Sequence, residues 1–170
     1  MYALIAIKAV SIYKLVLELE EKNIDKDIIL YIILGTVLLI CTITDLKYKE
    51  IYMPVIIAGL LLVVFFHIWQ QDFKFRDIAG TVVIFVFFMV SSAASRGQLG
   101  TGDAFLFALT GLGLGIMANI FIIMFSFILA FCVAVFLVIV KHKTRNYGIP
   151  LAPFVLSSFI IYVAGLYVPL

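Results

Sequence analysis

Two aspartates are the residues of this sequence best placed to do chemistry. Asp45 directly follows an apolar block at 28–44, and Asp103 directly precedes an uncharged stretch at 104–140. Burying a carboxylate at membrane depth costs free energy, so such a group usually faces water or the interior of a helix bundle. Asp103, at the start of its helix, could serve only as a cap and dipole partner. Asp45 ends its helix, where the dipole disfavours a negative charge, so capping does not explain it.

A pair of aspartates can hydrolyse a peptide bond without a metal or a nucleophilic side chain. Two carboxylates that flank one water share a proton, because both cannot ionise cheaply side by side. The ionised carboxylate takes a proton from the water, and the protonated one donates to the carbonyl oxygen of the substrate. We therefore expect Asp45 and Asp103 to be a catalytic pair that uses no metal and no cofactor.

The other reactive side chains do not form a competing site. The two histidines, His67 and His142, are isolated in the sequence, and the two cysteines, Cys41 and Cys132, lie inside apolar runs without any CxxC pair. A disulfide framework or a zinc site would need more cysteines or a different spacing. The cysteines are expected to be small apolar fillers.

The glycines before Asp103 are the next candidates. In the stretch GTGD (100–103), Gly100 and Gly102 leave the backbone beside the acid free of side chains. An extended peptide substrate could therefore approach the acid closely. The four-residue pattern is weak by itself. Its position supports a catalytic role, because it lies at a loop-to-helix junction on the same membrane face as a second aspartate.

The composition requires that membrane helices position these residues. Hydrophobic residues make up 65% of the 170 and charged residues 13%, against about 25% charged residues in an ordinary soluble domain. A soluble chain of this size could not bury so much apolar surface, so lipid must surround most of it. The formal net charge of +2 is too small to suggest a nucleic-acid partner.

Charged clusters and one predicted turn divide the chain into apolar blocks, each predicted to be a transmembrane helix. The six blocks are 28–44, 54–69, 78–94, 104–118, 119–140 and 149–168. A single helix over 104–140 would run about 55 Å, beyond a hydrocarbon core of about 30 Å. The chain must fold back there, and GIMAN (115–119) is the predicted turn. The predicted fold is an all-α membrane protein, a polytopic bundle of six transmembrane helices in a peptidase domain at 28–170.

Residues 1–27 are predicted to form a separate N-terminal segment. Its polar side chains fall on one narrow stripe at helical spacing, which is typical of an amphipathic helix in the membrane interface. The stripe consists of Lys8, Ser11, Lys14, Glu18 and Glu21. A seventh transmembrane helix is the alternative.

The spacing of the blocks places both aspartates on one membrane face, because two predicted spans separate them. The loops on that face carry six basic residues, Lys47, Lys49, Arg96, Lys141, Lys143 and Arg145. The opposite loops carry four, Lys22, Lys26, Lys74 and Arg76. Lysine and arginine are enriched in cytoplasmic loops. We therefore expect a multi-pass protein of the inner or plasma membrane, with both aspartates facing the cytoplasm.

Small residues follow Asp103 on one helix face. They are Ala104, Ala108, Gly111 and Gly115. Small residues let membrane helices approach closely. Packing within the chain is the favoured explanation, and a homodimer contact is the alternative.

Three stretches resemble a known family: TDLKYKEI (44–51), GQLGTGDAFLFALTGLGLG (97–115) and YGIPLAPFVLSSFIIYVAG (147–165). Over residues 28–168 the chain resembles the prepilin peptidases, or type IV leader peptidases, which are membrane aspartyl proteases of the G-x-G-D type. The resemblance implies that Asp45 and Asp103 are the catalytic pair at the cytoplasmic face. The implied substrates are prepilins, pseudopilins or preflagellins, which lose a short basic leader and keep their hydrophobic helix.

Two further residues are candidates for substrate binding on this basis. The resemblance favours the segment IPLAP (149–153), which contains Pro150, as a border of the active site, although a helix start alone would explain its prolines. Acidic Glu50 is a candidate to hold the basic leader.

The chain also departs from the family pattern. Tyr52 follows Ile51, where bacterial members often have proline, and Phe105 stands where a lysine is common. Larger bacterial members carry an N-terminal methyltransferase region, often with paired CxxC motifs, and these 170 residues offer neither the length nor the cysteines for it. We therefore expect leader cleavage without methylation, as in the compact members of tight-adherence pilus systems and in archaeal members.

Other functions remain as alternatives. A small transporter could use the same two aspartates to carry protons or cations, but it predicts carboxylates near the middle of the bilayer. A structural subunit would use Asp103 only as a cap and would leave Asp45 unexplained. A presenilin-like protease would carry tyrosine before the first aspartate, where this chain has Thr44.

Overall fold

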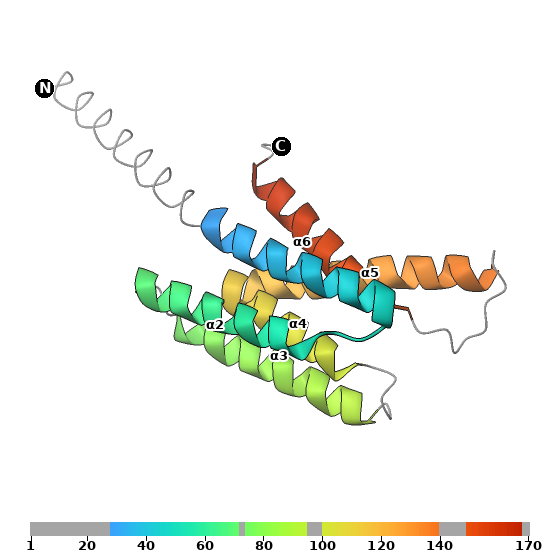
Figure 1. Ribbon diagram of the computed structural model, residues 1–170, viewed down its shortest axis with the longest axis horizontal. Coiled ribbons are helices and arrows are strands. Elements are labelled where there is room, and N and C mark those ends of the chain that lie inside the picture. Colours follow the sequence, from blue (N-terminus) through green and yellow to red (C-terminus); the bar gives the residue numbers. More distant parts are fainter. Residues whose placement is uncertain (1–27, 72–73, 95–99, 140–148, 168–170) are drawn as a thin grey trace, which may run out of the picture. The chain divides into compact units, whose positions relative to one another are not determined.

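The computed structural model describes residues 28–71, 74–94, 100–139 and 149–167, and all regular structure within them is helical (Figure 1). The first helix, Ile28–Tyr48, is drawn in blue without a label. The others are α2 (Met53–Gln70), α3 (Phe75–Ala94), α4 (Thr101–Leu114), α5 (Ile116–Ile139) and α6 (Ala152–Tyr167). The predicted segment 1–27 lies outside the described residues, so its place in or on the membrane stays a prediction.

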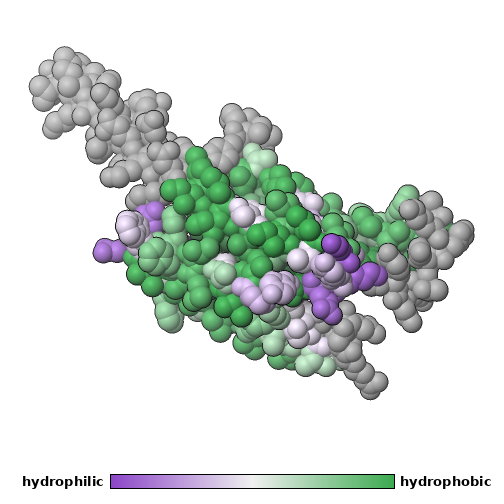
Figure 2. All heavy atoms as spheres, viewed as in Figure 1, coloured by the Kyte–Doolittle hydropathy of each residue, from purple (hydrophilic) through white to green (hydrophobic). Residues whose placement is uncertain are grey.

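The described helices confirm an all-helical membrane protein. Four of them are long and apolar enough to cross a bilayer: Ile28–Tyr48, α2, α3 and α5. The helices α4 and α6 are apolar but shorter; the 14 residues of α4 span only about 21 Å. Figure 2 shows one face, where hydrophobic residues form a broad surface and hydrophilic ones gather in small patches. That surface suits a chain whose solvent is lipid.

The reversal between α4 and α5 takes a single residue, Gly115. Its φ of +83° lies in the region that favours glycine. The helix α5 begins at once at Ile116, so the predicted start at 119 was three residues late. The sharp turn is possible because Asp77 of α3 supplies a cap: its Oδ1 accepts the Ile116 amide at 3.3 Å. A carboxylate at this helix start also complements the dipole of α5.

The chain divides into two compact units, 1–32 and 33–170, and the second unit is built around α4. Ten of its fourteen residues are buried, and it contacts α2, α3, α5 and α6. Phe88, Phe107 and Phe127, from α3, α4 and α5, form an aromatic cluster with ring centroids 4.6 to 6.1 Å apart. A helix enclosed in this way must be apolar nearly all round, which explains the long uncharged stretch after Asp103.

A buried polar network joins α4 to α5. Asn119 donates from Nδ2 to the Phe107 carbonyl at 2.9 Å and accepts at Oδ1 from the Thr110 hydroxyl at 2.8 Å. A Cβ on Gly111 would lie 2.5 Å from Asn119 Nδ2 and 2.7 Å from Thr81 Oγ1. Gly111 therefore serves close packing within the chain, as the small-residue face after Asp103 predicted.

The far end of α4 is held by a histidine that looked isolated in the sequence. His67, near the end of α2, lies with Nε2 2.8 Å from the Leu112 carbonyl oxygen. A carbonyl only accepts, so Nε2 donates this hydrogen bond. The last four carbonyls of a helix have no partner within the helix. His67 therefore supplies a donor that α4 itself lacks.

Candidate active site

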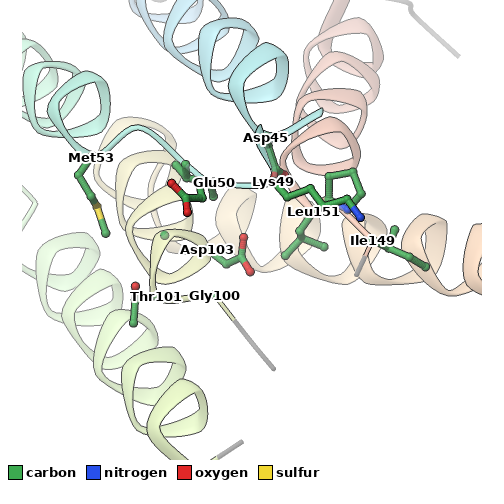
Figure 3. Close-up of a pocket in the computed structure, with 12 residues that line it drawn as sticks. Asp45, Lys49, Glu50, Met53, Gly100, Thr101, Asp103, Ile149 and Leu151 are labelled. Carbon is green, nitrogen blue, oxygen red and sulfur yellow. The ribbon is translucent and has the colours of Figure 1, made fainter. Parts of the chain in front are cut away.

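Both aspartates line one pocket of about 420 Å³ (Figure 3). Asp45 lies in the last turn of the helix Ile28–Tyr48, and Asp103 lies in the first turn of α4. Both are buried, with 6% and 9% of their surfaces exposed. The same pocket is lined by the four predicted substrate-binding residues, Gly100, Gly102, Glu50 and Pro150. The structure thus brings all six predicted site residues together, from segments up to 105 positions apart (150 − 45).

Asp45 is oriented by a second helix. Its Oδ2 accepts the backbone amide of Ala152 at 3.0 Å, and Ala152 is the first residue of α6. The carboxylate therefore sits at the positive end of the α6 dipole, which offsets the unfavourable end of its own helix. Ala152 was not itself a predicted site residue, but it lies in the segment 149–153 that was expected to border the site. Its only sequence signal was the pair of prolines at 150 and 153, which marks a helix start.

Asp103 combines a cap with a place in the pocket. Gly100 is the N-cap residue of α4, and the Asp103 amide donates to the Gly100 carbonyl at 3.1 Å. The Asp103 carboxylate accepts the Gly100 amide in return, which is one of the two hydrogen bonds of a capping box. Asp103 also lines the same pocket as Asp45. Capping and pairing are therefore compatible at this residue.

The second glycine of GTGD has a packing role. A Cβ on Gly102 would lie 2.8 Å from the Ile51 Cβ and 2.9 Å from its Cδ1. Ile51 belongs to the short linker between the helix that carries Asp45 and α2. The absence of a side chain at Gly102 lets this linker rest on the start of α4, beside Asp103. Gly100 is exposed, and a Cβ added there would lie 3.2 Å from Asp103 Oδ2.

The rest of the pocket combines charge and apolar walls. Lys49 and Glu50 are both exposed, and both line the pocket. The remaining lining residues are Ile51, Met53, Thr101, Ile149 and Leu151. Ile149 and Leu151 lie in the segment 149–153, which was expected to border the site. Ile51, Met53 and Thr101 were not predicted, because nothing in their residue types distinguishes them near a helix end. Among the described residues, no group of three or more histidines, cysteines or acids could hold a metal ion.

The fold and the pocket together define a class of helical membrane proteins in which two buried carboxylates share one site. Comparison with protein-family models matches residues 32–139 to the type IV leader peptidase family. The match covers well over half of the chain and includes Asp45 and Asp103. The chain therefore belongs to the type IV leader peptidase family, which confirms the resemblance found in the sequence. No curated protein and no solved structure matched the chain.

Proposed function

We propose that this protein is an intramembrane aspartyl endopeptidase that removes the short basic leader of prepilins, pseudopilins or preflagellins. The observation that carries the proposal is the pair of buried carboxylates, Asp45 and Asp103, in one pocket of a chain from this peptidase family. The family match gives no support to the alternative transport function. Both acids also lie at helix ends, where a transporter would need them deeper in the bilayer.

In the proposed reaction the two aspartates activate one water. The ionised carboxylate accepts a proton from the water as it attacks the peptide carbonyl carbon, and the protonated carboxyl donates to the carbonyl oxygen. The α6 amide at Ala152 and the Gly100 amide hold the two side chains in place for this step. Such fixed donors remove the cost of orienting the acids during the reaction.

The proposed topology has six transmembrane helices, with α4 and α6 included despite their length. Two crossings between Asp45 and Asp103 return both acids to one face. The excess of lysine and arginine in the loops of that face supports a cytoplasmic site in the inner or plasma membrane. A cytoplasmic pocket suits a substrate whose basic leader precedes its membrane helix.

Glu50 and Pro150 are proposed to contact the substrate. Glu50 is an exposed acid on the pocket lining, so it can attract a basic leader as the leader enters. Pro150 lines the pocket beside Leu151, just ahead of α6. With Gly100 and Gly102, it would border the path of an extended peptide.

The test is cleavage of a co-expressed prepilin by the wild type, Asp45→Asn and Asp103→Asn. We expect each single change to abolish cleavage, because each removes one of the two acids. The products are separated on a gel and their N-termini sequenced, with equal amounts of each variant in the membrane.

Asp77→Asn is the matched control. Asp77 also lies at a helix start, but it does not line the pocket, and an asparagine oxygen can still accept the Ile116 amide. We expect this variant to cleave normally. Wild-type cleavage by either Asp45→Asn or Asp103→Asn would show that the pairing is wrong.

A further inference from the structure

The helices around α4 leave one side of it open. Leu109 of α4 meets Gly59 of α2, and Gly111 of α4 faces Thr81 of α3. At about 100° per residue, Leu109 and Gly111 point about 200° apart. One of the two arcs between them carries Thr110, which bonds α5 through Asn119. On the other arc, no described side chain of α4 forms such a bond to a neighbouring helix.

The open arc consists of residues at spacings of three and four, which fall in one line along a helix. We name Thr101, Phe105, Ala108 and Leu112 the α4 strip. Thr101 is exposed, and Phe105 and Leu112 are half-buried, whereas most of α4 is buried. Ala108 is small and 7% exposed. Beyond Thr101 the strip is entirely apolar.

The helices α2 and α3 flank the strip without closing over it. Phe85 of α3 packs edge-on against Phe105, with ring centroids 4.9 Å apart. His67 of α2 bonds the carbonyl of Leu112 on the other side. Although α2 and α3 are consecutive helices, their described residues make no close backbone contact with each other. Phe105 and Leu112 therefore stay partly exposed at the strip, with the small, buried Ala108 between them.

The strip is continuous with the pocket. Thr101, its first residue, lines the pocket, and so does Met53 at the start of α2. In Figure 3, Met53 and Thr101 lie on the side of the pocket away from Ile149 and Leu151. A chain segment that leaves the pocket on this side meets the strip directly.

We propose that the α4 strip receives the transmembrane helix of the substrate, an inference that rests on the proposed leader peptidase function. The occupant must be apolar, because the strip beyond Thr101 carries no polar side chain and opens between two lipid-facing helices. From Thr101 to Leu112 the strip is about 16 Å long, or three turns of a helix. A substrate helix lying there places the bond that precedes it at the pocket, and it arrives by lateral movement in the bilayer.

The test is site-specific photocrosslinking to a tagged prepilin that the wild type cleaves. The photoreactive amino acid benzoylphenylalanine replaces Phe105 or Leu112 in the Asp103→Asn background, which keeps the prepilin uncut. Phe131 of α5 and Ile160 of α6, which are 69% and 56% exposed, are the matched lipid-facing controls. We expect prepilin adducts at the two strip positions at least about five times stronger than at the controls.

Three results would overturn the proposal: no prepilin adduct at the strip, equal adducts at strip and control positions, or strip adducts only with a second copy of this chain. Failure of the proposed function looks different, because the wild type would then cleave no prepilin at all. As a second readout, Phe105→Ala should raise the KM for the prepilin about fivefold and change kcat less than twofold. Phe131→Ala should change neither, and an unchanged KM in Phe105→Ala would count against the strip.

Discussion

The contact between Gly102 and Ile51 leads to the sharpest prediction about the site. The substitution Gly102→Ala adds one methyl group at a point 2.8 Å from the Ile51 Cβ and 2.9 Å from its Cδ1. An ordinary contact needs at least 3.4 Å, so the linker must move from α4 by roughly 0.6 Å (3.4 − 2.8). That linker follows the helix that carries Asp45, and Gly102 directly precedes Asp103.

The expected effect on stability is modest, and the effect on activity is large. Overpacking costs about 1–3 kcal/mol, and replacing glycine by alanine in a helix returns about 0.5–1 kcal/mol. The free energy of unfolding should therefore fall by no more than about 2.5 kcal/mol. A shift of about 1 Å in a catalytic group can cost a factor of about 100 in rate. We expect prepilin cleavage to fall by about 10- to 100-fold.

The assay compares kcat/KM on a purified prepilin with thermal unfolding in the same detergent. Gly165→Ala is the matched control, because a Cβ there would meet nothing within 4 Å; it should cleave at the wild-type rate. Adding Ile51→Ala to Gly102→Ala removes the Cδ1 contact and leaves the Cβ contact, so part of the activity should return. Wild-type activity in Gly102→Ala, or an equal loss in Gly165→Ala, would refute this explanation of the glycine.

Two further predictions concern charge and buried polarity. Glu50→Gln should raise the KM for a basic-leader prepilin about threefold and leave kcat unchanged, because one exposed charge is worth about 0.2–1 kcal/mol; a KM that is unchanged at low salt would contradict this role. Asn119→Leu should lower the free energy of unfolding by about 1–3 kcal/mol, since hydrogen bonds between membrane helices contribute about 0.6–1.7 kcal/mol each. The Thr110 hydroxyl limits the loss, because it can turn to backbone carbonyls at 3.2 Å. Thermal unfolding in detergent measures the change, and a variant as stable as the wild type would show that the network is not stabilising.

The sequence determined the helical blocks and the two acids. Five runs of apolar residues between charged clusters, of which the run 104–140 is too long for one span, predicted six helices. The described residues contain one helix at each predicted position, because apolar length is a local property of the chain. Asp45 and Asp103 were identified by their positions at the ends of these blocks. The exact turn at Gly115 was not predictable, because its cap, Asp77, comes from another helix.

Only the tertiary structure decided how the site is assembled. From the sequence, Asp45 lies at the unfavourable end of its own helix, and nothing local shows that α6 brings the Ala152 amide to it. The sequence likewise does not show that Ile51 packs against Gly102, or that His67 bonds the carbonyl of Leu112. Each contact joins segments that are distant in the sequence, and its partner depends on how the helices and the linker pack around α4. Periodicity along one chain segment contains no information about which neighbouring helix will face it, whereas packing in three dimensions does.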